Sequence, residues 1–481
     1  DRFPGENPAI SRRSHRPTPN PRRNHVFPVI NAKPAACSMG RRWSRCHFRS
    51  HFTDIVPPNR RVRRSSAHER HRYQVRGSVI PMHDFKILAL TKATGGIALY
   101  NRLLLSELDK MGVVSHTLCL SEEAESYAKN LTELGLGAEA MHMARYSIDP
   151  LGDVRVLKRT LRLVRDLDVD VVICHGSKAG FIGRAVGLIT GRPIIYRQAS
   201  LPFLKRVQGR KASLYWALDF AAKWFGGHVV TLTDYARRQT LAHKLVRPDR
   251  ISVIRTGVDI ARFRPAEDRA ARIRALGLDP DRPVVGWIGR IEPQKAPLDY
   301  VDTLQRVAGR HPEAQFVLAG EGRLRGEVEA ALKAAGLSDR VAMLGWQSAP
   351  EQVLQALDVY VLTSHWEGLP LTLLEAMACG CCCLSTDVDG CAEAIEDGVS
   401  GRLVAAGATA DLAAALDDVL RDPGLRRRYA SAARQRTVAL FDKTEMVAKW
   451  IELLSNVTAG KSAARGTPRP IIPARSPSEG S

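Results

Sequence analysis

The chain has 481 residues, 44% of them hydrophobic, and a formal net charge of +21 at pH 7. This length is enough for two or three domains with cores of their own. No run of apolar residues approaches the roughly 18 that a membrane-spanning helix needs, so the sequence predicts no transmembrane helix.

The positive charge lies mainly at the two ends of the chain. Residues 1–81 contain 18 Arg or Lys against 4 Asp or Glu and are rich in Pro, Arg and Ser. Such a segment cannot bury enough apolar surface to fold, so we predict a disordered basic extension over 1–81. We expect the working protein to begin at Met82. A transit peptide and a nucleic-acid-binding arm are alternatives, although neither an amphipathic helix nor interleaved aromatic residues support them.

From residue 82 onward, short apolar runs alternate with longer amphipathic stretches. Runs that are continuous and rich in β-branched residues are typical of buried parallel strands. The first series of predicted strands covers residues 85–91, 171–175, 193–197 and 229–233. Amphipathic stretches at 97–112 and 151–167 predict two of the helices between them.

The same alternation restarts after residue 265. The second series of predicted strands covers residues 283–289, 314–320, 341–345, 359–364 and 382–386. Repeated strand–helix alternation predicts an α/β fold with doubly wound parallel sheets. We therefore expect two Rossmann-like domains facing a cleft, with ligands at the carboxyl ends of the strands. The expected boundaries are 82–262 and 263–440 for the domains, 441–458 for a helix that packs back, and 459–481 for a disordered tail.

The stretch HWEGLPLTLLEAMACG (365–380) follows one of these strands and predicts a helix with an anion site at its start. Pro370 suits the first helical position, and Gly380 suits the position just beyond the end. The amides of Leu371 and Thr372 would then point out of the helix start, where a phosphate can bind.

Two glutamates flank this predicted helix start. Glu375 lies on an apolar helix, where a carboxylate is tolerated only with hydrogen-bond donors, and the diol of a ribose would supply two. Glu367 precedes the helix and faces the same opening, where sugar hydroxyls would satisfy it. The alternative is that both residues cap the helix or pair with Arg.

The strand predicted over 283–289 ends in the sequence GRIEPQK (289–295). Arg290 and Lys295 follow Gly289 in the turn, where preorganised cations can stabilise the charge that develops on a departing diphosphate. Taken alone, these charges would more simply be solvated loop residues.

Nine cysteines are present, and five of them lie between Cys379 and Cys391. Three are consecutive, at positions 381–383, which does not match the CxxC spacing of a zinc site. We interpret them as small buried residues in a reducing compartment, without a metal.

The combination of motifs is far more specific than any of its parts. GRIEPQK, GEG (320–322), LGW (344–346) and DGVSGRLV (397–404) resemble the donor domain of family 4 glycosyltransferases, and Glu367 and Glu375 match the Glu-x7-Glu signature of that family. In the first half, TGGI (94–97), HGSKAGFIGR (175–184) and RTGVDIARF (255–263) resemble it too. The resemblance spans about residues 84–457.

This resemblance implies the GT-B fold and transfer of a sugar from a UDP- or GDP-linked donor to an acceptor, with retention of configuration and without a metal or cofactor. It implies that Arg290 and Lys295 stabilise the leaving diphosphate, that Glu367 positions the donor sugar and that His175 lies near its reacting face. The remaining implied contacts are Glu375 to the ribose, Gly289, Leu371 and Thr372 to the donor nucleotide, and Gly95 and Gly96 in a turn that approaches phosphates or acceptor.

The opening of the first domain is most similar to the subgroup that builds bacterial surface polysaccharides on polyprenyl-diphosphate lipids. That similarity implies a lipid-linked saccharide acceptor and a cytoplasmic protein in peripheral contact with the inner face of the membrane. Residues 203–211 and 237–250 are basic with apolar insertions, which makes them the candidate membrane surfaces.

Several other functions remain as alternatives. The acceptor could be a soluble small molecule, or the chain could be a non-catalytic nucleotide- or nucleic-acid-binding protein. A glycosidase could also use two carboxylates, but the anion site and the two cations would then have no role. A metal-dependent transferase could use Asp168 with Asp170, or Asp387 with Asp389. A nicotinamide dehydrogenase is disfavoured because the first turn lacks the GxGxxG spacing.

Overall fold

The computed structural model describes residues 85–465 apart from 94, 122–123, 144–148, 205–206 and 208. All of the described residues belong to one compact unit. The predictions made for residues 1–81 and for the last part of the chain, from residue 466, lie outside the described residues.

The first half of the described chain forms a seven-stranded parallel sheet in the order β3-β2-β1-β4-β5-β6-β7. Its strands are β1 (Lys86–Thr91), β2 (Val114–Leu120), β3 (Gly137–Met141), β4 (Val171–His175), β5 (Ile194–Gln198), β6 (His228–Thr231) and β7 (Ile251–Val253). Its helices are α2 (Gly95–Asp109), α3 (Ala124–Glu133), α4 (Pro150–Asp166), α5 (Ser177–Thr190), α7 (Ala212–Ala222) and α8 (Asp234–Ala242). Three short 3-10 helices accompany them: η2 (Gly209–Lys211), η3 (Lys223–Phe225) and η4 (Pro248–Arg250).

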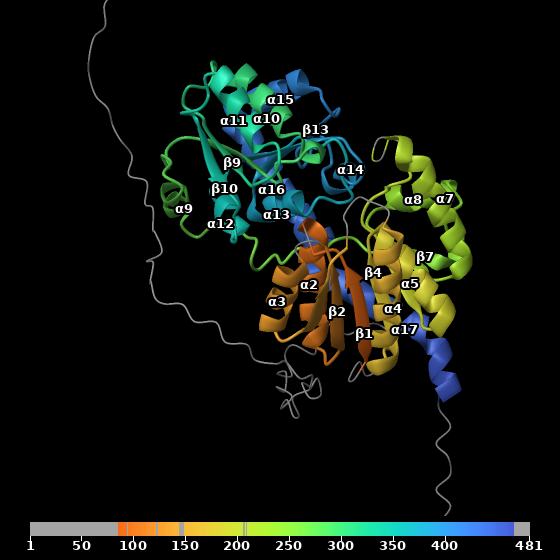
Figure 1. Ribbon diagram of the computed structural model, residues 1–481. Coiled ribbons are helices and arrows are strands. Elements are labelled where there is room, and N and C mark those ends of the chain that lie inside the picture. Colours follow the sequence, from red (N-terminus) through yellow and green to blue (C-terminus); the bar gives the residue numbers. More distant parts are fainter. Residues whose placement is uncertain are drawn as a thin grey trace, which may run out of the picture. The chain divides into compact units, whose positions relative to one another are not determined.

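Helices cover both faces of this sheet, as Figure 1 shows for the labelled helices around β1 and β4. Successive residues of a strand point to opposite faces. Ile87 and Ala89 of β1 therefore join a core with residues of α2 and α3, whereas Leu88 and Leu90 join a second core with residues of α4 and α5. Burial on both faces explains why the central strands are continuous apolar runs.

The second half forms a six-stranded parallel sheet in the order β10-β9-β8-β11-β12-β13. Its strands are β8 (Val284–Ile288), β9 (Gln315–Ala319), β10 (Val341–Gly345), β11 (Val359–Leu362), β12 (Cys382–Thr386) and β13 (Arg402–Val404). Its helices are α9 (Arg269–Ala275), α10 (Pro297–Val307), α11 (Arg325–Ala334), α12 (Pro350–Leu354), α13 (Leu371–Cys379), α14 (Cys391–Ala394), α15 (Thr409–Arg421) and α16 (Pro423–Leu440), with η5 (Pro293–Lys295). The predicted pair of doubly wound parallel sheets is confirmed.

Helix α17 (Lys443–Arg465) returns from the second half to the first and extends beyond the helix expected over 441–458. The Trp450 indole N–H donates a hydrogen bond to the Tyr100 hydroxyl on α2 at 2.5 Å. The Lys443 ammonium contacts Glu107 at 2.9 Å and Asp259 at 2.8 Å. Helix α17 thus stabilises the first sheet.

The seven cysteines within the described part of the chain are all buried and unbridged. Desolvation raises the pKa of Cys379, Cys382 and Cys391 to about 12, so these thiols are protonated and act as packing residues. Along the described helices, no segment is both long and apolar enough to cross a bilayer.

Candidate functional site

The start of α13 lies at the carboxyl end of β11. Pro370 is the N-cap residue with extended backbone (φ −72°, ψ 113°), one position earlier than its predicted place as the first helical residue. Its carbonyl accepts the amides of Leu373 at 3.1 Å and Leu374 at 3.3 Å. By helix geometry the amides of Leu371 and Thr372 have no acceptor inside the helix, so they remain available to an anion.

Tyr360 on β11 fixes the start of this helix against the next strand. Its buried hydroxyl lies 3.0 Å from the Thr372 hydroxyl and 3.3 Å from the carbonyl of Ile288, the last residue of β8. Burial raises the pKa of Tyr360 well above its usual value, so the hydroxyl keeps its proton. The loop after β8, which carries Arg290, and the start of α13 are thereby held together.

Glu375 lies in the second turn of α13 and is only 6% exposed. Among the residues that the structure describes, none donates a hydrogen bond to its carboxylate. Desolvation therefore raises its pKa to about 8, with Arg262 opposing the shift. A buried carboxyl group without donors is costly in the free protein and is suited to a ligand that supplies hydroxyl groups.

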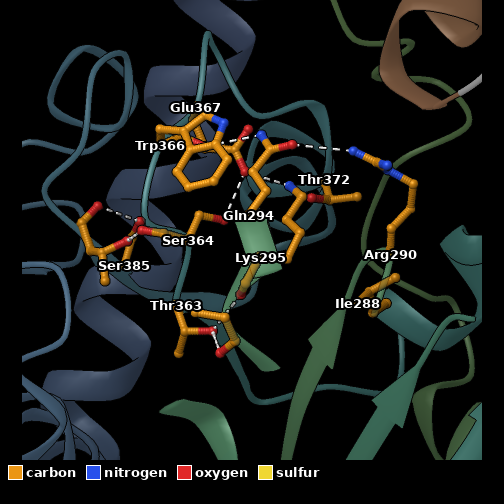
Figure 2. A network of polar contacts seen from close by, with 12 residues as sticks. Ile288, Arg290, Gln294, Lys295, Thr363, Ser364, Trp366, Glu367, Thr372 and Ser385 are labelled. Carbon is orange, nitrogen blue, oxygen red and sulfur yellow. Dashed lines mark hydrogen bonds and ion pairs between the residues drawn. The ribbon is translucent and has the colours of Figure 1, made fainter. Parts of the chain in front are cut away.

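Lys295 and Glu367 form an ion pair with 2.5 Å between the ammonium and carboxylate Oε1 (Figure 2). Their side chains are 12% and 8% exposed. The same carboxylate oxygen accepts a hydrogen bond from the Ser364 hydroxyl at 2.7 Å, and the Glu367 amide donates to Asp389 at 2.9 Å. Glu367 is thus fixed from three sides, and it holds Lys295 in one position.

Gln294 joins the loop after β8 to the loop before α13 (Figure 2). Its side-chain oxygen accepts from Arg290 at 3.2 Å, and its side-chain nitrogen donates to the carbonyl of Trp366 at 3.0 Å. Its own carbonyl accepts the amide of His365 at 2.9 Å. Arg290, Lys295 and Glu367, which sequence motifs predicted separately, are therefore brought into one network.

The GEG motif gives this network its backbone support. A methyl group at Gly320, whose φ is +140°, would lie 1.8 Å from the carbonyl oxygen of Gly289. A methyl group at Gly322 would lie 2.3 Å from the carbonyl oxygen of Ile291. Only glycine permits such close approach of two loops, so the motif positions the turn that begins at Gly289.

The first loop of the amino-terminal half reaches the same place. Gly95 adopts a left-handed conformation (φ +62°), and a methyl group there would lie 3.6 Å from Nε of Arg290. A methyl group at the following Gly96 would have no atom within 4 Å. The two predicted glycines thus lie at the start of α2, and Gly95 lies beside Arg290, the residue predicted to contact the diphosphate.

His175 ends β4 and is 1% exposed. Neither ring nitrogen has a hydrogen-bond partner within the described part of the chain. Desolvation and then the charge of Arg197 hold its pKa well below the usual value, so the imidazole is neutral. Its ring meets that of Tyr100 edge-on, with 5.9 Å between centroids.

Arg197 is a site residue that the sequence did not reveal. It is the register partner of His175 on the neighbouring strand β5 and is 3% exposed. A charged residue within the apolar run PIIYRQ was the one available signal. The run is equally typical of an ordinary strand end, because a sequence does not show whether an acidic side chain lies opposite the arginine in the fold.

The two Asp-x-Asp pairs differ in location. Asp170 precedes β4 at the amino-terminal edge of the first sheet, where it accepts the Lys86 amide at 2.9 Å and where Asp168 pairs with Arg192. This edge is opposite to the one that carries His175. Asp389, in contrast, follows β12 and contacts Glu367.

Two family models match the chain. Glycosyltransferase Family 4 matches residues 94–262, and Glycosyl transferases group 1 matches residues 268–436. Together they include every residue of the network and both strands that carry His175 and Arg197.

Curated relatives cover both halves. An Escherichia coli UDP-Gal:alpha-D-GlcNAc-diphosphoundecaprenol alpha-1,3-galactosyltransferase is 29% identical over 51% of this chain and 64% of its own length. A Streptomyces kanamyceticus alpha-D-kanosaminyltransferase is 31% identical over 60% of this chain and 77% of its own length. D-inositol 3-phosphate glycosyltransferase from Mycobacterium sp. (strain KMS) is 36% identical over 42% of this chain, which spans about half of that relative.

Solved structures agree on the fold. Anabaena Alr3699/HepE in complex with UDP and glucose superposes with a TM-score of 0.67 at 21% identity, covering 77% of this chain and 100% of that one. Sucrose-phosphate synthase from Thermosynechococcus elongatus gives a TM-score of 0.68 at 18% identity, covering 78% of this chain and 100% of that one.

Proposed function

The chain belongs to the family 4 glycosyltransferases and has their GT-B fold, and from this premise we propose that it moves a sugar from a nucleoside diphosphate sugar to an acceptor with retention of configuration. The proposal rests chiefly on the start of α13. The helix start offers two amides, and the Lys295 cation lies near enough to act on the buried carboxyl group of Glu375, which has no hydrogen-bond donor among the described residues. The half-buried Arg290 lies in the loop after β8, which Tyr360 holds against the same helix start.

Each part of this site has a task in such a reaction. The amides of Leu371 and Thr372 bind the diphosphate, and Glu375 accepts hydrogen bonds from the ribose diol. As the bond between sugar and diphosphate breaks, negative charge grows on the leaving oxygen, and Arg290 and Lys295 stabilise it. These cations would do the work of a divalent ion, which supports a reaction without a metal.

In this proposal, Glu367 and His175 act on the sugar of the donor. Glu367 is held by Lys295, Ser364 and Asp389, so its carboxylate has a fixed position in which to accept sugar hydroxyls. His175 is neutral and its two nitrogens have no partner within the described residues, so it can exchange hydrogen bonds with a hydroxyl group near the reacting carbon. Fixed polar groups of this kind orient a substrate without reorganisation during the reaction.

The acceptor we propose is a lipid-linked saccharide of surface polysaccharide biosynthesis. The name of the Escherichia coli relative includes such a lipid. The name of the Mycobacterium relative includes D-inositol 3-phosphate, so a soluble acceptor is the second candidate. A lipid acceptor would place the enzyme in the cytoplasm, in peripheral contact with the membrane.

The membrane surface we propose differs from the two surfaces predicted from the sequence. Phe203 and Leu245 are buried in a small core, so the apolar residues of segments 203–211 and 237–250 face inward. Exposed apolar side chains lie instead on α7 and η3, where Trp216 is 38% and Trp224 76% exposed. We call these residues, with Lys223, the Trp224 surface.

Basic groups border the Trp224 surface. Lys223 lies over the rings of Phe220 and Trp224, and its ammonium donates to the carbonyl of Lys244 at 3.3 Å. Exposed tryptophan beside lysine is typical of proteins that dock on anionic lipid headgroups. The basic segment 237–250 therefore keeps a role beside this surface.

The experiment that tests the function is incubation of the purified chain with radiolabelled UDP- and GDP-sugars and two acceptor sets, lipid extract and soluble amino sugars. We expect transfer from one donor with unchanged rate after addition of EDTA, and NMR of the product should show the anomeric configuration of the donor. Inversion of configuration, or activity lost with EDTA and restored by Mg²⁺ or Mn²⁺, would contradict the proposed mechanism.

A further inference from the structure

Arg197 is a buried cation near the carboxyl end of β5 in the first sheet. It lies between His175 on β4 and Val230 on β6 in the strand register. Its guanidinium carbon stands 3.4 Å from the centre of the Tyr100 ring. Because the residue lies at the carboxyl ends of the strands, it shares the sheet edge at which α/β proteins bind their ligands.

The guanidinium has few polar partners. Nη2 reaches the Thr256 hydroxyl at 3.5 Å, and the guanidinium also interacts with the neutral Tyr100 hydroxyl. Nε and Nη1 have no hydrogen-bond acceptor within the described part of the chain. No carboxylate of the described residues pairs with it. An arginine keeps its charge even when buried, and a buried charge without an anion strongly destabilises a folded protein.

A second buried arginine shows the ordinary solution to this problem. Arg184 on α5 is 2% exposed and stacks over Tyr196 at 4.7 Å, much as Arg197 stacks over Tyr100. Arg184, however, lies 3.5 Å from the carboxylate of Asp219 on α7. Among the described residues, one buried arginine thus has an anionic partner and the other has none.

The surroundings of Arg197 are rigid and polar. Tyr100 is fixed by the hydrogen bond from Trp450, and neither ring nitrogen of the neighbouring His175 has a partner among the residues that the structure describes. These groups offer hydrogen-bond donors and no negative charge. A site of this kind fits an anionic oxygen that arrives with a substrate.

We propose that Arg197, assisted by the imidazole of His175, binds a phosphate group of a substrate at the carboxyl edge of the first sheet. This inference rests on the proposed function, in which both the nucleotide donor and a lipid-diphosphate acceptor carry phosphates. Arg290 and Lys295 belong to the second sheet and serve the donor, so the first-sheet cation favours a phosphate on the acceptor.

The test compares Arg197→Met with wild-type protein and with Arg184→Met as a matched control. Calorimetry first measures the binding of UDP to each protein. Inorganic pyrophosphate is then titrated into two samples of each protein, one free of UDP and one saturated with UDP. Thermal unfolding of the ligand-free proteins is measured in parallel. Arg184→Met removes an equally buried and stacked arginine that differs from Arg197 in having a carboxylate partner, Asp219.

We expect Arg197→Met to raise the Tm, because an unpaired buried charge is removed, and to weaken binding at least tenfold. If the phosphate belongs to the acceptor, UDP affinity is unchanged and pyrophosphate binding beside UDP is lost. If it belongs to the donor, UDP affinity itself falls. Arg184→Met should lower the Tm, since Asp219 loses its partner, and leave both affinities as in wild type.

Two results would overturn the proposal. One is that Arg197→Met binds UDP and pyrophosphate like wild type. The other is a lower Tm for Arg197→Met, which would mean that the guanidinium already has the partners it needs. If the wild-type protein binds neither UDP nor GDP, the proposed nucleotide chemistry fails. The role of Arg197 is then still decided by comparing the pyrophosphate affinity of the wild-type protein with that of Arg197→Met.

Discussion

The ammonium of Lys295 and the carboxylate of Glu367 lie 2.5 Å apart although 72 residues separate them in the chain. The cation proposed for the leaving diphosphate is thus already paired with the carboxylate proposed for the sugar. Each residue fixes the position of the other before any substrate arrives. Such preorganisation avoids the cost of arranging charges during the reaction.

Lys295→Ala should lower both turnover and stability. We expect kcat to fall about 10²-fold or more, because a group that stabilises charge in the transition state is lost. The free energy of unfolding should fall by about 3 kcal/mol, because Glu367 keeps a buried charge without its cation. Steady-state kinetics and urea unfolding measure the two effects.

The double variant Lys295→Met with Glu367→Gln separates these two roles. It leaves no unpaired charge, so most of the lost stability should return while turnover stays low. The single variants Lys295→Met and Glu367→Gln are measured beside it. If the loss of stability in the double variant equalled the sum of the losses in these two single variants, the coupling between Lys295 and Glu367 would be refuted.

Arg290→Ala should affect the reaction without affecting the fold. Arg290 contacts the Gln294 side chain at 3.2 Å and has no ion pair within the described part of the chain. We therefore expect turnover to fall on the order of 10²-fold with a nearly unchanged Tm. Gln294→Ala, which removes the support and keeps the cation, should cost less turnover. Unchanged turnover in Arg290→Ala would argue against the assigned role.

Most strands that are buried on both faces were predictable from the sequence, although the interior strand β2 (Val114–Leu120) was missed. The apolar runs at 171–175 and 382–386 coincide with β4 and β12. Strand β3, GAEAM, escaped prediction because it lies at the edge of its sheet and consists mainly of small residues. Strand β13 has three residues and gives no periodic signal.

Individual residues of the candidate site were singled out from the sequence, but the network that joins them was not. Motifs marked Arg290, Lys295 and Glu367, since loops after strands carry function in α/β folds. The Lys295–Glu367 pair depends on the tertiary approach of two loops, which no local pattern encodes. Arg197 escaped prediction for the same reason, because what distinguishes it is that no carboxylate among the described residues pairs with it in the folded chain.

Glu375 should make stability depend on pH in an unusual direction. Its pKa is about 8 in the folded protein against 4.5 for an ordinary glutamate, so the folded state holds the proton more tightly. The free energy of unfolding therefore falls as the pH rises from about 4.5 to about 8. Glu375→Gln removes this loss, so its Tm should exceed that of wild type increasingly between pH 5 and pH 8.

The same variant tests the nucleotide contact. Glu375→Gln should weaken donor binding about ten- to a hundredfold, the effect of losing hydrogen bonds to a charged acceptor. Wild-type protein should release protons on binding UDP at pH 7, because hydroxyl donors favour the ionised carboxylate. Calorimetry in buffers of different ionisation enthalpy measures this release. Equal proton release by Glu375→Gln would contradict the assignment.

Gly95 and Gly96 should respond differently to the same added methyl group. Gly95→Ala forces an alanine to φ +62°, which destabilises by roughly 1 kcal/mol. Gly96→Ala meets open space in the first turn of α2 and should stabilise by up to about 1 kcal/mol. If a substrate phosphate approaches this backbone, Gly96→Ala should nevertheless bind substrate more weakly. Tm values and Michaelis constants decide whether stability and binding separate in this way.

The Trp224 surface should bind anionic membranes. Trp224→Ser removes the most exposed aromatic residue of η3, and it should markedly reduce cosedimentation with phosphatidylglycerol vesicles while leaving the Tm unchanged, because the ring is 76% exposed. Trp346→Ser is a matched control, since Trp346 is 72% exposed but follows β10 in the other half. The control should sediment like wild type, and vesicles of phosphatidylcholine should retain little of any protein because the lysines then lack an anionic partner. If both tryptophan variants lost cosedimentation equally, general hydrophobicity and not the Trp224 surface would account for the membrane contact. A soluble acceptor would then be the better explanation of the site.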